Sequence, residues 1–293
     1  MNRLNTTNEY GSFHEAFHSR VELLLEDGEL SEPVTSDKSV GSNFGQTPRQ
    51  TLEVIADKFV ITNPRDRLLD ECRNMDLGFA TANFLWSTDE EASHEMIVQY
   101  NKHGEKFMGP DGKFQCAIPD RITTENEGNL VKEVIRMLTE DPTSRRAIIP
   151  FIRASDVVDE PIDFPCPSYA HFFVRKNKLD LVVGMRSQSL LGVLPYDAFL
   201  FTMLQESVAL DLGVELGKYI HISDSLHIYD NEIERAEALL DCERVPRSMG
   251  RMAFSPITNP AVHDAEKEYR VTGQMPQVGD EYWDGLLGNL RIK

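Results

Sequence analysis

A cysteine stands between two prolines in the stretch "DFPCPSYAHFFVRKNKLDLVVGMRSQS", which begins at Asp163. Because Pro165 and Pro167 lack the backbone N–H that a central strand needs, Cys166 is expected at a strand end or edge, next to a cleft. A thiolate there could attack carbon. Only about a few per cent of a free thiol is ionised at neutral pH, so nearby positive charge is required. By itself, such a cysteine is more often a buried small hydrophobic residue than a nucleophile.

Two arginine pairs could supply positive charge. Arg186 and Ser187 follow the apolar run "LDLVVGM", and Arg145 and Arg146 precede the run "AIIPFI". An arginine fork beside a hydroxyl is suited to a phosphate group. A surface charge that closes a strand is the commoner explanation for each pair. Neighbouring residues on a strand also point to opposite faces, so both arginines of a pair can reach one ligand only where the strand ends or bulges.

The segment "HIY" carries a third polar group. The two-residue period of a strand places His227 and Tyr229 on one face, where they could hold a sugar hydroxyl or form an ordinary half-buried pair.

Helices and strands that would position these groups can be read from apolar periodicity and turn residues. Helices are predicted at 12–26, 66–86, 126–141 and 197–213, the last ending at a C-cap glycine, Gly213. A strand pair is predicted at 51–62, a strand at 144–153, a hairpin at 170–186 turning at 176–178, and a strand at 218–232. Strict β–α–β alternation is missing, which favours an α+β or three-layer fold in one domain over 1–293, with 1–45 as a less regular extension.

Composition narrows the classes of partner. The net charge of −18 opposes binding to duplex nucleic acid or to an anionic membrane, but arginines clustered locally can still hold a small phosphorylated ligand. No apolar leader and no membrane-spanning run is visible, so a cytoplasmic protein is expected. The four cysteines lie far apart without a CxxC pair, and the sequence therefore predicts neither a zinc site nor a disulfide framework.

Taken in order, SRR (144–146), PC (165–166), RS (186–187), LPYD (194–197) and HIY (227–229) resemble the thymidylate synthase family, from about Arg49 to Ile233. This resemblance implies a three-layer α/β fold with a mixed sheet, a sheet-to-sheet homodimer, a pyrimidine nucleoside monophosphate and 5,10-methylenetetrahydrofolate. Cys166 would add to C6 of the base. The resemblance assigns the phosphate to Arg186 and Ser187, with Arg145 and Arg146 of the partner subunit, and the sugar to His227 and Tyr229. Arg49 is a candidate for the phosphate-binding arginine that the family carries near its N-terminus.

Asp197 occupies the position at which thymidylate synthases carry an asparagine that pairs with uracil. An ionised carboxylate only accepts hydrogen bonds, so it would repel O4 of uracil and accept from the 4-amino group of cytosine; a protonated one could also donate to cytosine N3. An aspartate here resembles the cytidylate and deoxycytidylate (CMP and dCMP) hydroxymethylases of the family. Alternatively, Asp197 only caps a helix over 198–212.

Four departures lie on the folate and proton-transfer side. Asn83 replaces the family's catalytic glutamate, Ile118-Pro119 replaces a Tyr-Gly pair, Ser189 replaces an aspartate near the base, and "LLGNLRIK" does not match the family's C-terminal tail. A neutral amide can order water but cannot exchange protons near neutral pH. Glu71 or Asp120 are candidate replacements for the lost proton-transfer groups.

Three hypotheses therefore stand. The first is a folate-dependent cytidylate hydroxymethylase with rebuilt proton chemistry. The second is an enzyme that uses the Cys166 adduct for other C5 chemistry without folate. The third is a nucleotide-binding homologue without catalysis, against which the retained Cys166 argues, because a binder needs no thiol there.

Overall fold

The computed structural model describes residues 8–31, 50–69, 72–124, 128–159, 161, 163–242 and 247–293. Two residues singled out above, Arg49 and Glu71, lie outside the described residues.

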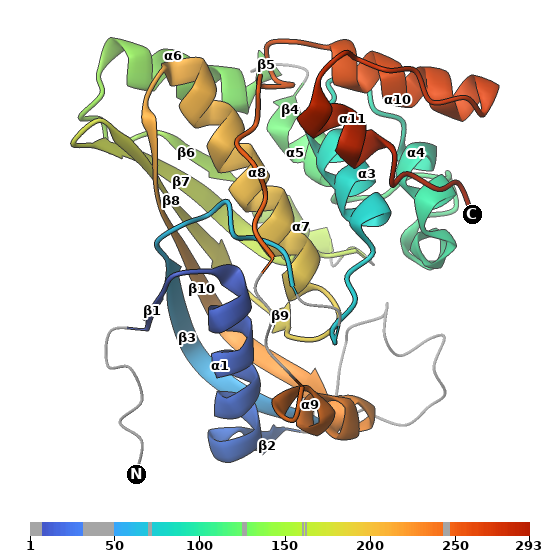
Figure 1. Ribbon diagram of the computed structural model, residues 1–293. Coiled ribbons are helices and arrows are strands. Elements are labelled where there is room, and N and C mark those ends of the chain that lie inside the picture. Colours follow the sequence, from blue (N-terminus) through green and yellow to red (C-terminus); the bar gives the residue numbers. More distant parts are fainter. Residues whose placement is uncertain are drawn as a thin grey trace.

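A mixed sheet forms one side of the molecule (Figure 1). Its strands run in the order β1-β3-β10-β8-β7-β6, with β2 paired to β3 and β9 paired to β10. The strands are β1 (Glu9–Tyr10), β2 (Glu29–Ser31), β3 (Thr51–Ile61), β6 (Ile148–Pro150), β7 (Pro167–Arg175), β8 (Lys178–Met185), β9 (Gln188–Ser189) and β10 (Glu215–Tyr229), and a separate small pair joins β4 (Thr123–Thr124) to β5 (Gly128–Asn129). β10 runs parallel to β8 and β9 but antiparallel to β3, so the predicted mixed α/β fold is confirmed.

The predicted hairpin is present as β7 and β8. Its turn residues Lys176 and Asn177 both have positive φ, 51° and 59°, as a two-residue type I′ turn requires. The predicted strand pair over 51–62 is wrong: β3 is one strand, paired along its length with β10, and it passes through Ala56 at φ 60°.

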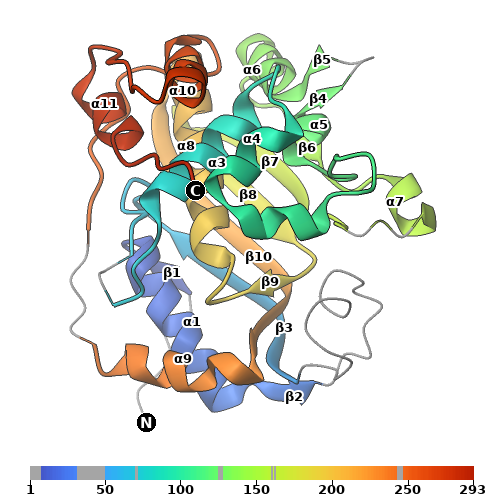
Figure 2. The same cartoon turned by 90° about the vertical axis from the view of Figure 1, so that its right-hand side faces the viewer.

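Helices cover one side of the sheet (Figures 1 and 2). They are α1 (Phe13–Asp27), α3 (Leu77–Thr88), α4 (His94–Tyr100), η1 (Lys102–Phe107), α5 (Ile118–Ile122), α6 (Leu130–Glu140), α7 (Ala154–Asp159), α8 (Leu194–Leu212), η2 (Asp230–Glu232), α9 (Ile233–Leu240), α10 (Ala261–Thr272) and α11 (Glu281–Leu287). Most of α8 is buried, as expected of a helix that is apolar on nearly every face, and it ends at Gly213 with φ 67°, as predicted.

Three helices begin later or earlier than predicted from the sequence. The helix predicted from 126 begins at Leu130. The helix predicted over 66–86 begins only at Leu77, where the side chain of Asp76 accepts from the N–H of Phe79. The helix predicted from 197 begins at Leu194. Pro195 lies in the first turn of α8, where proline is favoured.

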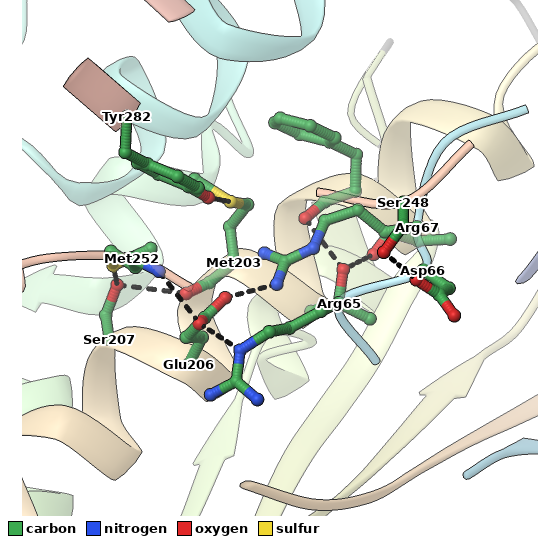
Figure 3. A network of polar contacts seen from close by, with 12 residues as sticks. Arg65, Asp66, Arg67, Met203, Glu206, Ser207, Ser248, Met252 and Tyr282 are labelled. Atoms are coloured by element: carbon green, nitrogen blue, oxygen red, sulfur yellow. Dashed lines mark hydrogen bonds and ion pairs between the residues drawn. The ribbon is translucent and has the colours of Figure 1, made fainter. Parts of the chain in front are cut away.

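A buried ion cluster joins the loop before α3 to α8 (Figure 3). Glu206 of α8 pairs with Arg67, which is fully buried, and with Arg65 at 2.7 Å, and it accepts from the N–H of Met252. Burial raises the pKa of Glu206, but the charge of Arg67 and the hydrogen bonds outweigh it and leave the pKa below its ordinary value. The carboxylate therefore stays ionised and fastens three segments together.

The opposite face of the sheet carries partly exposed apolar side chains. Ile148 stands opposite His171, His171 opposite Val182, and Val182 opposite Ile220, so four strands contribute to one row. Along β8, Leu181 and Val183 are fully buried on the helical side while Val182 between them is only half-buried. This alternation marks a sheet with one covered face.

One expectation about the cysteines is wrong. Cys72, before α3, and Cys242, after α9, form a disulfide with a Cα–Cα distance of 6.3 Å. Their sequence separation of 170 residues gives no local pattern from which the pairing could be read.

Candidate active site

Cys166 and Arg186 face each other across the open end of the hairpin. Pro167 pairs with Met185, and one residue beyond this pair the N–H of Arg186 donates to the carbonyl of Cys166 over 2.9 Å. The two strand ends thus bring together two residues, Cys166 and Arg186, that are 20 positions apart in the sequence.

The Arg186 side chain also holds the segment before the cysteine. Its Nε donates to the carbonyl of Pro165 at 2.9 Å, its Nη2 donates to that of Phe164 at 3.0 Å, and the group stacks 4.8 Å from the Phe164 ring centre. Nη1 makes no hydrogen bond to the described residues, so part of the fork remains for an anionic ligand.

Both residues line a cavity of about 420 Å³ between α3, α4, η1 and the hairpin mouth. Cys166 is half-buried, which leaves its sulfur reachable. Most of the wall is apolar and much of it aromatic, formed by Phe79, Trp86, Ile97, Phe107, Phe114, Ile118 and Phe164. Its polar groups include His103 and Lys106 of η1.

Asp197 lies at the end of a buried hydrogen-bond chain. Tyr219 Oη is 2.8 Å from His221 Nδ1, His221 Nε2 is 3.2 Å from Gln188 Oε1, and Gln188 Nε2 donates to Asp197 Oδ2 at 2.9 Å. Burial lowers the pKa of His221 to about 3, so the imidazole is neutral and can accept at one nitrogen while it donates at the other. The chain fixes the orientation of the Asp197 carboxyl group.

The position of Asp197 excludes a helix-capping role. It lies inside the first turn of α8 and its N–H donates to the carbonyl of Val193, which is the N-cap, so Asp197 does not cap the helix. Burial raises the pKa of Asp197 to about 7, although the Gln188 hydrogen bond acts in the opposite direction. Both protonation states are therefore accessible near neutral pH.

The predicted sugar-binding residues lie beside the segment that follows Arg186. β9 pairs with β10, which sets Ser189 opposite His227. His227 and Tyr229 share a face of β10, as predicted, with ring centres 5.3 Å apart. Ser187 is half-buried between β8 and β9, and Ser189 Oγ accepts from the N–H of Gly192 at 3.3 Å.

Arg145 and Arg146 precede β6 at the edge of the sheet, and both are exposed. Neither is among the described residues that line the cavity of their own chain. Their assignment to the site of a partner subunit stays a prediction.

Comparison with known proteins gives the family. The model of the thymidylate synthase family matches residues 74–270. The chain belongs to the thymidylate synthase family. Curated thymidylate synthases of Lactococcus lactis, strains IL1403 and SK11, are each 25% identical to it, over 76% and 80% of this chain and 81% and 85% of theirs. The solved structure of thermostable thymidylate synthase A from Bacillus subtilis has the same fold, with a TM-score of 0.69 and 20% identity over 80% of this chain and 86% of that one. The chain is thus a member of a family of one-carbon transferases that bind pyrimidine nucleotides, use methylenetetrahydrofolate and are typically dimeric.

The structure also locates the departures from the thymidylate synthase pattern. Asn83 is half-buried on α3, on the helix face of Phe79 and Trp86, which line the cavity. Ile118 lines the cavity as well. Asp120, a candidate replacement for the missing acid, pairs with His94 Nε2 at 3.3 Å and is not among the described cavity residues. The C-terminal Lys293 is tied to Asp76 at 2.8 Å and to the carbonyl of Gln99.

Sequence analysis missed three groups at the site. Gln188 and His221 orient Asp197, and Asp163 lines the cavity. Period-two alternation puts Tyr219, His221 and Ser223 on one face of β10, and this buried polar stripe was the available signal for His221. The contacts of Asp163 are with residues far away in the sequence, so no local pattern announces it.

Within the described residues, none of the helices combines the length and apolar character that crossing a bilayer requires.

Proposed function

We propose that this protein is a (deoxy)cytidylate 5-hydroxymethylase that works through a covalent bond between Cys166 and C6 of the base. The observation that carries the proposal is the pairing of Cys166 with Arg186 at one cavity in a member of this family. We further propose that the whole chain, 1–293, is a single cytoplasmic domain that acts as a homodimer.

The proposed chemistry starts with the Cys166 thiolate. Its sulfur adds to C6, and the electron pair of the C5–C6 double bond makes C5 nucleophilic. C5 then forms a bond to the methylene carbon that the folate would supply, and the C5 proton leaves to a base as the bond from this carbon to the folate nitrogen breaks, which would release tetrahydrofolate. Water adds to the resulting methylene carbon and becomes the hydroxyl group. The sulfur departs from C6 as the double bond is restored. The positive charge of Arg186 supports the thiolate and binds the nucleotide phosphate.

Asp197 supports cytosine as the base. In its protonated form the carboxyl group would donate to N3 while its other oxygen accepts from the 4-amino group. Its raised pKa makes that form available near neutral pH. Ser189 and the His227–Tyr229 pair, beside Arg186 and Ser187, are proposed to hold the base edge and the sugar.

The cavity next to Cys166 suits 5,10-methylenetetrahydrofolate. Its aromatic side chains can stack on the pterin and the aminobenzoyl ring, and His103 and Lys106 offer positive charge to a glutamate tail. When bound, the folate would supply the one-carbon unit.

The uncovered sheet face supports a homodimer. Ile148, His171, Val182 and Ile220 form a row that a second copy could cover, and Arg145 and Arg146 lie next to this row at β6. In such a dimer these two arginines would reach the phosphate in the partner's site.

A second candidate is C5 chemistry through the same adduct without folate. Asn83 and Ile118 favour it, because neither can transfer a proton. Ile118 lines the cavity, and Asn83 lies on the same face of α3 as two cavity residues. The half-buried thiol weighs against a third candidate, a homologue that binds nucleotide without catalysis.

Mass spectrometry of the nucleotide after incubation with the protein and methylenetetrahydrofolate tests the proposal. A 5-hydroxymethyl product from CMP or dCMP, absent with Cys166→Ala, is expected. A 5-methyl product from the uridine analogue would overturn the hydroxymethylase assignment. No product, together with Cys166-dependent exchange of the C5 hydrogen with solvent, would favour the second candidate.

A further inference from the structure

A carboxyl group lies in the same cavity as the thiol. Asp163 stands three residues before Cys166, and among the described cavity residues it is the only carboxylic acid. The other titratable or charged groups of this wall are His103, Lys106, Cys116, Cys166 and Arg186.

Two backbone N–H groups hold the Asp163 carboxyl group in place. Its Oδ1 accepts from Gln115 at 3.1 Å and its Oδ2 accepts from Cys116 at 2.8 Å. Each carboxylate oxygen has two lone-pair directions, so both can still accept a proton. These contacts therefore orient the Asp163 carboxyl group and leave it able to accept a proton.

A strong positive partner for Asp163 is missing among its described contacts. Arg121 makes two bonds to Asp156, at 2.8 and 3.0 Å, and a third contact to the sulfur of Cys116. Burial raises the pKa of Asp163 above its ordinary value, although the N–H groups and the charge of Arg121 act in the opposite direction. A raised pKa makes the Asp163 carboxylate a stronger base, which favours proton removal by this group.

The site needs such a group. Asn83 and Ile118 cannot accept a proton, and Asp120 is paired with His94 outside the cavity. We infer that Asp163 is the proton-transfer residue that removes the hydrogen from C5 of the nucleotide. This inference rests on the proposed function. In the Cys166 adduct the C5 proton passes to a carboxylate oxygen of Asp163, and the electron pair of the C5–H bond stays at C5. When no one-carbon unit is bound, this pair restores the C5–C6 double bond as the sulfur leaves C6, which exchanges the C5 hydrogen with solvent.

Exchange of the C5 hydrogen with solvent tests the residue. Cytidylate labelled with deuterium at C5 is incubated with the full-length protein in ordinary water, and loss of label is followed by mass spectrometry. Asp163→Asn should slow exchange by roughly 100-fold or more, the range that general acid–base groups contribute, and Asp163→Glu should restore part of the rate. Cytidylate affinity, measured by calorimetry, should change by less than about threefold in both variants, because Asp163 acts on the proton and not on binding.

The control is Asp156→Asn. Asp156 is a nearby buried carboxylate that pairs with Arg121 and is not among the described residues of the cavity wall. Its exchange rate should stay near that of the unmutated protein. Equal losses in the Asp156 and Asp163 variants would overturn the inference, since the effect would then be loss of loop structure. An unchanged rate in Asp163→Asn, with exchange abolished by Cys166→Ala, would overturn it and leave the proposed function standing. Exchange that persists in Cys166→Ala would instead overturn the proposed function.

Discussion

The N–H of Arg186 donates to the carbonyl of Cys166, while the Arg186 side chain donates to the carbonyls of Phe164 and Pro165. One arginine thereby binds three consecutive residues that end at the thiol. Pro165 suits this arrangement because it offers a carbonyl acceptor and no competing N–H group. The position of the sulfur is therefore coupled to the group proposed to bind phosphate.

Arg186→Lys should weaken nucleotide binding and also lower the reactivity of Cys166. Lysine keeps the charge but lacks the planar fork that reaches two carbonyls and a ligand together. Losing one or two charge-assisted hydrogen bonds should weaken cytidylate binding by roughly 10- to 100-fold and slow alkylation of Cys166. Calorimetry and thiol labelling measure the two effects. Arg175→Lys, at the exposed far end of the hairpin, should change neither, and an affinity close to normal in Arg186→Lys would remove Arg186 from the phosphate site.

Asp197→Asn should shift the choice of base. The unmutated protein is expected to bind cytidylate more tightly than uridylate, and the amide should narrow or reverse this preference because it can pair with N3–H and O4 of uracil. Calorimetric titration of both nucleotides into both proteins gives the ratio. Tighter binding of uridylate by the unmutated protein would contradict the role assigned to Asp197.

The same substitution should stabilise the free protein at alkaline pH. The folded pKa of Asp197, about 7, exceeds the ordinary value of 3.8, so the contribution of this group to stability is full below pH 3.8 and is lost as the pH rises to about 7. Asparagine does not titrate. The advantage of Asp197→Asn in free energy of unfolding should therefore be about 2 to 3 kcal/mol larger at pH 8 than at pH 5.

Urea unfolding at the two pH values measures this difference. Asp224→Asn, at an exposed position of β10, is the matched control and should leave the pH dependence unchanged. An equal effect of Asp197→Asn at pH 5 and pH 8 would mean that Asp197 is not buried in its protonated form.

Glu206→Ala should destabilise the fold strongly. The substitution leaves Arg67 buried and without its carboxylate, a loss that typically costs about 3 to 5 kcal/mol. Urea denaturation measures it. Glu140→Ala removes an exposed partner of Arg136 and should have little effect. Similar midpoints for the two variants would show that the cluster in Figure 3 does not hold the α8 region together.

Sequence patterns predicted the parts of this structure that depend on local chemistry. The hairpin, its turn and the C-cap at Gly213 follow from residue types at fixed spacing, and the motif order placed Cys166 next to Arg186. The start of α8 was predicted three residues too late, although Pro195 was a usable signal. This error made a helix cap a plausible role for Asp197.

The features that sequence patterns did not predict depend on contacts between segments far apart in the chain. Asp163 reaches the cavity through hydrogen bonds to residues 47 and 48 positions away, and Cys72 pairs with Cys242 across most of the chain. The loose alternation over 51–62 suggested two short strands. β3 stays extended past Ala56 because it pairs with β10, which lies more than 150 residues further along the chain and so leaves no local signal.

Alkylation of Cys116 and Cys166, which lie outside the disulfide, tests most directly whether the Cys166 sulfur and the Arg186 guanidinium group contact the same nucleotide. The labelled peptides are identified by mass spectrometry. Cys116 lines the same cavity and serves as the internal reference. We expect cytidylate to slow labelling of Cys166 at concentrations at which cytidine, which lacks the phosphate, has no effect. Labelling of Cys116 should change little. Labelling of Cys166 at an unchanged rate, under conditions where calorimetry shows that cytidylate is bound, would contradict this expectation.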